Sequence, residues 1–455
     1  MIAARSTGQG TAGEIRLQVR ELFQSSHGTV TSESAGSGNA GTLMVDVGRL
    51  LLTDGARLSS STSSTGHGGT VLVTAGDIIR LAGRDREGNA SGLFSTTTSP
   101  LSGAGAAGTI TVNARAVALE GGIIQASSSG AGDAGAIAVT VGSMALTGGG
   151  QLASNTSHIG HGGTVTVTAA DSLRVSGPGT GLFTRTTGSG PGGDITVQAP
   201  RVTLGEGATL SAESTGPGNA GNVTLTLGDT FVSTNGSIAT RATQADGGNI
   251  QITAPVLVRL RDSAITAEVG GGATTIGGNI TIDPQFIVLQ NSQIVANAFQ
   301  GQGGNIRLQA QRAFLADPAS QVSASSALGI NGQVAIQAPV TSISGAVAPL
   351  PQTFAQTAEL LRSRCVERLR EGTVSRLVMG GRDGVPLEPG SLLLSPLEQV
   401  VEERGIQEGE QGSQNPAAPP GGIWSPQAPA PNGLEVECAR WMGKSVATET
   451  PKRRR

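Results

Sequence analysis

The sequence predicts an all-β fold: a right-handed parallel β-helix of about twelve coils, followed by a small C-terminal module of helical and irregular structure. Three observations predict it. A motif led by glycine recurs about every 28 residues, apolar and polar residues alternate after each of these glycines, and the composition is extreme. The 455 residues include 70 glycines and no tyrosine, and only 2% are aromatic. This composition is far from that of an ordinary globular enzyme.

The repeat sets the length of one coil. Successive motif glycines lie 26 to 30 residues apart, except for one interval of 39 between Gly69 and Gly108. The additional residues of that interval surround positions 84–89 and lack an alternating apolar triplet. We therefore expect them to loop out of the coil. The twelve motif glycines are Gly13, Gly41, Gly69, Gly108, Gly135, Gly163, Gly193, Gly221, Gly248, Gly278, Gly304 and Gly332.

The coil that begins at Gly193 shows the elements of one repeat. Residues 195–198 alternate between apolar and polar side chains, which is the pattern of a half-buried strand. Residues 202–204 and 210–212 predict a second and a third short strand, and glycines between them indicate turns. Residues two and four after each motif glycine should be buried, and the residue between them should be exposed.

The energetics of one coil require stacking. About six inward aliphatic side chains contribute roughly 8–15 kcal/mol. Ordering some 28 residues costs roughly 30–50 kcal/mol. A single coil cannot offset that cost, so residues 1–345 are predicted to form one domain of stacked coils.

The residue after the motif glycine predicts a structural ladder. It carries an amide in five successive coils, and in-register parallel strands bring equivalent residues about 4.8 Å apart. We expect these amides to bond along the stack, the alternative being five independently solvated turn residues. They are Asn222, Asn249, Asn279, Asn305 and Gln333.

Residues 346–400 predict a cap for the last coil. An amphipathic helix is expected there, with Phe354, Leu361 and Leu369 on its apolar face. A cap covers apolar side chains and strand edges that the last coil leaves open.

The two cysteines leave two interpretations. Cys365 is on the apolar face of the predicted helix, where it is either a small buried apolar residue or the partner of Cys438 in a disulfide. Residues 401–455 predict a flexible linker and a short basic tail.

No catalytic, cofactor-binding or metal-binding residues are predicted, and neither is an enzyme. Several GxGxxG motifs occur, but each opens a strand, whereas a dinucleotide site needs a helix there. His27, His67, His158 and His161 all lie beside turn glycines, which favours solvated loop residues. A polysaccharide-acting enzyme is a weaker alternative, because no cluster of charged groups is expected at a repeating position. The few charges and aromatics argue against nucleic acid as a partner.

The GG-x-I-x-V-x-A repeat resembles the central rod of filamentous haemagglutinin-like exoproteins of two-partner secretion systems. Residues 375–389, SRLVMGGRDGVPLEP, resemble the C-terminal G-R-G-G-L-P-x-x-P element of cyanobacterial-type members, with departures at Asp383 and Val385. The resemblance covers nearly the whole chain and places it in the C-terminal part of the rod.

The resemblance implies a secreted rod at the cell surface, associated with the outer membrane, that acts in adhesion or aggregation. Its implied partners are the outer-membrane transporter barrel of the two-partner system and a surface receptor or glycan whose identity the sequence does not encode. The family's N-terminal secretion domain is not found, so we expect a fragment of a longer protein or a start assigned downstream of the true one. A structural surface-layer or matrix protein is the alternative.

Overall fold

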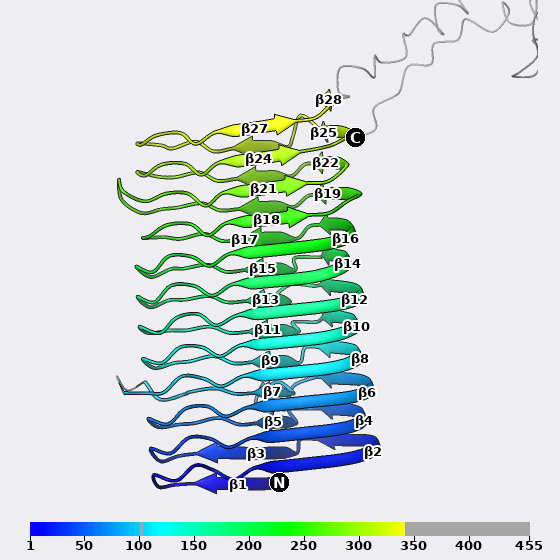
Figure 1. Ribbon diagram of the computed structural model, residues 1–455, viewed down its shortest axis with the longest axis vertical. Coiled ribbons are helices and arrows are strands. Elements are labelled where there is room, and N and C mark those ends of the chain that lie inside the picture. The colour runs from blue at the N-terminus through cyan, green and yellow to red at the C-terminus, as the bar shows by residue number, and fades with distance from the viewer. Residues whose placement is uncertain (101–102, 342–455) are drawn as a thin grey trace, which may run out of the picture. The chain divides into compact units, whose positions relative to one another are not determined.

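The computed structural model describes residues 1–100 and 103–341. They form an all-β parallel solenoid of about twelve coils without any helix, and the coils stack in chain order (Figure 1). The predicted cap with Phe354, Leu361 and Leu369, the two cysteines Cys365 and Cys438, and the tail at 401–455 lie outside the described residues.

The longer strands form a sheet of 16 members at the front of Figure 1. In eight coils one strand fills the whole side, and in the last four this side is divided between two strands. The undivided strands are β2 Ile15–Ser26, β4 Leu43–Thr53, β6 Val71–Ala82, β8 Ile110–Glu120, β10 Ile137–Thr147, β12 Val165–Ser176, β14 Ile195–Gly205 and β16 Val223–Thr234. The divided ones are β18 Ile250–Thr253 and β19 Leu257–Arg261, β21 Ile280–Asp283 and β22 Phe286–Gln290, β24 Ile306–Gln309 and β25 Ala313–Ala316, and β27 Val334–Gln337 and β28 Val340–Thr341.

The shorter strands form a second sheet of 12 members behind the first (Figure 1). They are β1 Ile2–Ser6, β3 Thr29–Ser34, β5 Arg57–Ser59, β7 Gly92–Phe94, β9 Ile123–Gln125, β11 Gln151–Ala153, β13 Gly181–Phe183, β15 Thr209–Ser211, β17 Ser237–Ala239, β20 Ala264–Thr266, β23 Gln293–Val295 and β26 Gln321–Ser323. Beyond them, single residues of successive coils pair as parallel bridges.

The predicted burial of the residues two and four after the motif glycine is confirmed in the inner coils, whereas the residue between them is half-buried in most coils and exposed in a few. Ile195 and Val197 are fully buried and Thr196 between them is half-buried, while Gln251 is exposed between two buried isoleucines. Because all strand pairs are parallel and in register, each inward side chain stacks on its equivalents in the neighbouring coils. The core is therefore one continuous column of aliphatic side chains.

The first two predicted strands of a coil are joined in most coils. In β14 the chain continues from Ile195 to Gly205, with only a shift of register between Ala199 and Arg201. A bulge bends a strand while the ladder continues on both sides of it, so alternation alone cannot separate the two strands. Pro255 lies between β18 and β19, and the Asp283–Pro284 pair lies where β21 ends before β22.

The long coil has the loop that was expected. Residues 84–89 form a small turn closed by an antiparallel bridge between Arg84 and Ala90, and no further coil is made. The Asp85 carboxylate accepts hydrogen bonds from the backbone N–H of Glu87 and from the backbone and side-chain amide of Asn89. The hydrogen bonds from Asn89 and the nearby Arg57 charge lower the pKa of Asp85, and burial offsets this only in part.

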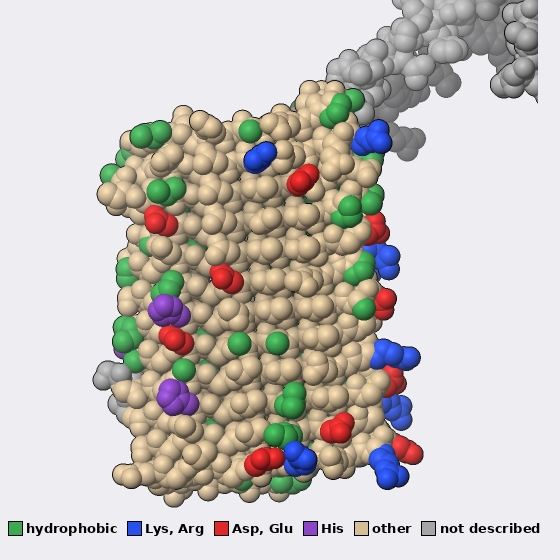
Figure 2. Space-filling view, viewed as in Figure 1, with side chains coloured by type: hydrophobic (Ala, Val, Ile, Leu, Met, Phe, Trp, Pro, Cys, Tyr) green, Lys and Arg blue, Asp and Glu red, His purple; other side chains and the backbone are tan. Residues whose placement is uncertain are grey.

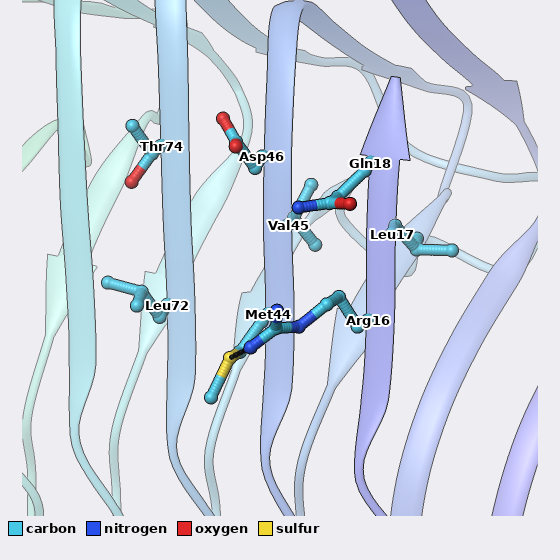
Figure 3. A pocket seen from close by; sticks show the side chains of 8 residues that line it. All are labelled: Arg16, Leu17, Gln18, Met44, Val45, Asp46, Leu72 and Thr74. Atoms are coloured by element: carbon cyan, nitrogen blue, oxygen red, sulfur yellow. Dashed lines mark hydrogen bonds between the residues drawn. The ribbon is translucent and has the colours of Figure 1, made fainter.

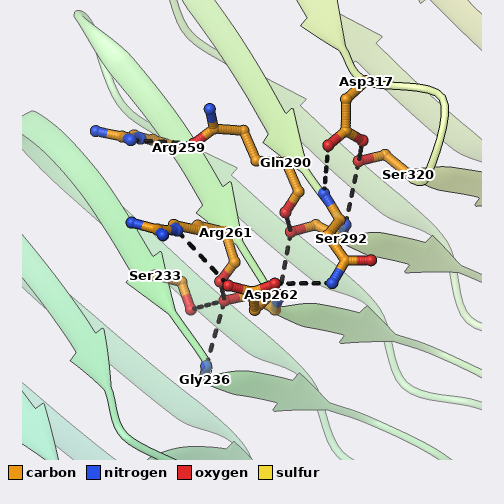
Figure 4. A network of polar contacts seen from close by, with 11 residues as sticks. Ser233, Gly236, Arg259, Arg261, Asp262, Gln290, Ser292, Asp317 and Ser320 are labelled. Atoms are coloured by element: carbon orange, nitrogen blue, oxygen red, sulfur yellow. Dashed lines mark hydrogen bonds and ion pairs between the residues drawn. The ribbon is translucent and has the colours of Figure 1, made fainter. Parts of the chain in front are cut away.

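The corner between the long and short strands holds non-glycine residues in the left-handed conformation. Asp262 and Asn291 have φ values of 49° and 46°, and the Asn291 side chain donates to Asp262 over 2.7 Å (Figure 4). In the next coil the Asp317 carboxylate accepts from the Asn291 backbone and from Ser320, which lowers the pKa of Asp317. Side chains thus link this corner from coil to coil.

Candidate functional site

The structure brings the five predicted ladder residues together along the stack. The Oδ1 atom of Asn249 accepts from both the backbone N–H and the side-chain amide of Asn279, over 2.9 and 3.0 Å. Asn305 donates its backbone N–H to Asn279, and Gln333 donates its own to Asn305, both over 3.0 Å. The ladder is therefore carried by backbone-to-side-chain bonds throughout, and amide-to-amide bonds are added only in its earlier rungs.

Two parts of the ladder system were missed by sequence reasoning. The first rung is Asp194, whose carboxylate accepts from the backbone and side chain of Asn222 over 2.8 and 3.0 Å. A second, interrupted ladder lies two residues before the motif glycine. There the backbone N–H of His161 donates to the Asp133 carboxylate, and the backbone N–H of Ile276 donates to the Asp246 carboxylate. The signal was an Asp, Asn or His two residues before six of the twelve motif glycines.

A polar groove runs along the outer side of the short strands. Its floor consists of the outward residue at the end of each short strand, and these residues are largely buried although they point away from the core. Two cavities lie along this surface, one at the coils of Arg57 and Phe94 and one at the coils of Glu213 to Glu268. A second row of outward residues lies two positions further along each coil. We call the first row the groove floor and the second row the groove wall. The floor is Thr31, Ser59, Phe94, Gln125, Ala153, Phe183, Ser211, Ala239, Thr266, Val295 and Ser323, and the wall is Glu33, Ser61, Thr96, Ser127, Asn155, Arg185, Glu213, Arg241, Glu268, Asn297 and Ser325.

The first deep part of the groove lies at coils with β1, β3, β5 and β7. It is a cavity of about 220 Å³ between the guanidinium of Arg57 and the wall, with Phe94 on its floor. The Arg57 guanidinium carbon lies 4.6 Å from the centre of the Phe94 ring, which is the geometry of a cation–π contact. Ser61 accepts hydrogen bonds from the backbone and the hydroxyl of Thr96, both over 3.1 Å.

Buried polar atoms without partners occur in the coils that form this cavity and in the coil that follows them. In the described part of the chain there are four: Oγ1 of Thr31, Nε of Arg57, Oγ1 of Thr97 and Oγ of Ser128. Thr31 is on the groove floor in register with Ser59, and Arg57 lines the cavity. Such atoms are costly in a folded protein, so a concentration of them in adjoining coils calls for an explanation.

The second deep part of the groove has charged walls. Glu213 accepts from Arg241 over 2.8 Å and lies 3.5 Å from Arg185, so its carboxylate links its own coil to the coils on both sides. The next wall residue, Glu268, lines a cavity of about 410 Å³ with Glu213 and Arg241. Burial raises the pKa of Glu268, and the nearby Arg241 charge only partly offsets this.

This arrangement corrects one prediction. No charged cluster was expected at a repeating position, yet one row in four successive coils consists of Arg185, Glu213, Arg241 and Glu268. Their spacings of 28, 28 and 27 residues follow the period of the repeat. They were missed because the alternation of apolar residues draws attention to the strands, whereas this row lies beyond them.

The front sheet also has a depression. A depression of about 250 Å³ on the front sheet lies among Arg16, Met44 and Asp46, and the Arg16 guanidinium contacts the Met44 sulfur there at 3.3 Å (Figure 3). The same guanidinium lies 3.8 Å from the Glu14 carboxylate. The front of the molecule otherwise shows few charged side chains, and most of those in view lie along one edge (Figure 2).

The described coils show neither a metal cluster nor a membrane helix. No group of three His, Cys, Asp or Glu side chains within residues 1–100 and 103–341 could hold a metal ion. All four histidines are exposed, and Nδ1 of His67 accepts the backbone N–H of Ala106. Over the same residues no helix is long and apolar enough to cross a membrane.

Comparison of the chain with models of protein families, with curated proteins and with solved structures finds no match.

Proposed function

We propose that the protein is a β-helical adhesin of the cell surface, similar to the filamentous haemagglutinin-like exoproteins and exported by two-partner secretion. One observation carries the proposal beyond the fold itself. A concave polar surface follows the short strands through successive coils, and it includes half-buried charged groups. Solenoids present ligand surfaces in this way, because every coil adds an equivalent position to the same face.

Cells that carry the gene provide the test of location and role. The protein should be degraded when protease is added to whole cells. Deletion of the gene should reduce attachment or aggregation of the cells, and complementation with the gene should restore it. Protection of the chain in whole cells, with full degradation after lysis, contradicts the surface location. Unchanged attachment and aggregation after deletion contradict the adhesive role.

A further inference from the structure

We propose that the cavity lined by Arg57 and Phe94 binds a sugar unit that carries a carboxylate, as part of an acidic polysaccharide. The proposal rests on the adhesive function above and names the class of its ligand. It is argued from the groups that line this cavity, from their lack of partners and from the loop beside it.

Two guanidinium groups provide the site for the carboxylate. Arg5 and Arg57 both line the cavity, and the Arg5 side chain forms no hydrogen bond or ion pair within the described residues. Arg57 is held against the Phe94 ring, and its Nε–H has no acceptor. Arginine binds carboxylates through paired N–H groups, and a guanidinium that is already oriented loses less freedom on binding.

The remaining groups suit the hydroxyls of a sugar ring. Ser59 and Ser61 line the cavity with hydroxyls 3.0 Å apart, and Thr96 continues the row in the next coil. The Glu33 carboxylate, which has no ion-pair partner among the described residues, is an acceptor for a ring hydroxyl. A sugar acid has both kinds of group on one ring, so it can satisfy the arginines and the hydroxyl row together.

The site coincides with the one long coil. Phe94 and the inserted residues 84–89 belong to that coil, and the Asp85 carboxylate is close enough to Arg57 to feel its charge. Inserted loops are where solenoids and other scaffolds carry recognition. The unpartnered atom of Arg57 lies in the coil directly before the insertion, and that of Thr31 lies one coil further away.

The groove continues from this cavity with uncharged polar groups. Gln125 on the floor is half-buried and has no side-chain partner within the described residues, while Ser127 and Asn155 form the wall. One coil advances by about 4.8 Å, which is close to the length of one sugar unit in an extended 1,4-linked chain. Neighbouring units can therefore meet equivalent positions of successive coils.

Titration calorimetry on the purified full chain tests the proposal, with polygalacturonate, its methyl ester and a neutral β-glucan as probes. We expect polygalacturonate to bind, and Arg57→Gln to weaken binding by about tenfold or more, as for the loss of a charge-assisted hydrogen bond. Arg5→Gln is the second variant, and Arg16→Gln, on the front sheet, is the matched control that should bind like wild type. Circular dichroism checks that each variant retains its strands.

Three results would overturn the proposal: no binding of polygalacturonate, equal binding of the methyl ester, or unchanged affinity in both Arg57→Gln and Arg5→Gln. Free galacturonate as a fourth probe separates recognition of a single unit from recognition of the polymer. Whole-cell attachment of the same variants is measured in parallel. If cells attach but the protein does not bind polygalacturonate, the proposed ligand is wrong and the adhesive function is retained. If the protein binds polygalacturonate but cells do not attach, the adhesive function is wrong and the proposed ligand is retained.

Discussion

Asn249 directs both of its nitrogens at one oxygen: its backbone N–H and its side-chain amide donate to Oδ1 of Asn222, over 2.9 and 3.2 Å. Its own Oδ1 in turn accepts from Asn279. Asn249→Ala therefore leaves the Asn279 backbone N–H without its acceptor. We expect a loss of about 1 kcal/mol in local stability and faster hydrogen exchange at Asn279. Gln251→Ala, exposed in the same coil, is the control, and equal exchange in both variants contradicts the role of the ladder.

A second prediction concerns the motif glycines. A Cβ atom at Gly221 would overlap the carbonyl oxygen of Gly193 in the preceding coil, whereas one at Gly228 would lie 3.4 Å from Pro200. Gly221→Ala should lower the free energy of unfolding by about 3 kcal/mol, because the coils must move apart. Gly228→Ala, in the same coil, should change it little. Similar melting temperatures for the two variants would show that the coils can absorb the extra methyl group.

A third prediction concerns the inserted loop. Deleting residues 84–89 joins Gly83 to Ala90 and leaves three residues between Ala82 and Gly92. The preceding coil has the same number between Thr53 and Arg57, with which Ala82 and Gly92 are in register. The melting temperature should remain nearly unchanged, since the loop's hydrogen bonds are made mostly within itself. A large fall in a thermal unfolding scan means that the loop supports the core.

A fourth prediction concerns pH. The pKa of Glu268 is raised by burial, so the folded state binds its proton more tightly than the unfolded chain does. Stability from this group is present at acid pH and is lost as the pH rises from the ordinary value of a glutamate through the raised value. Glu268→Gln should therefore be more stable than wild type at neutral pH, with the difference vanishing under acid conditions. Urea unfolding at several pH values measures this, and a difference that grows toward acid pH contradicts it.

A fifth prediction concerns the end of the described solenoid. In β27 the positions that are buried in earlier coils are exposed, with Val334 at 42% and Ile336 at 37%. If the segment with Phe354, Leu361 and Leu369 covers them, truncation after residue 350 should cause aggregation and remove the helical circular-dichroism signal. A soluble, monomeric truncated chain contradicts the cap.

The fold could be predicted because every coil repeats the same pattern of residues about every 28 positions. The spacing of Gly193 and Gly221 sets the coil, and the alternation from Ile195 to Gln198 sets the inward face. The continuity of β14 could not be predicted, because the shift between Ala199 and Arg201 depends on the neighbouring coils.

The candidate site was much harder to predict. Arg57 and Phe94 are separated by more than one ordinary coil length of sequence, and their contact depends on where the extra residues of the long coil are placed. The concavity that buries Ser59 is a property of the folded corner and has no local sequence signal. The amide ladder, by contrast, has a side-chain amide at one register position in successive coils, which is why its members could be named.

The ladder bonds also have a direction. In every rung from Asp194 to Gln333 the backbone N–H belongs to the later coil and the side-chain oxygen to the earlier one. A finished coil thus presents acceptors that are already positioned for a segment that has yet to arrive. A chain that becomes available from its N-terminal end, whether from a ribosome or through a pore, can then add coils one at a time on a preformed template. Growth in that order leaves only the newest edge open at any moment.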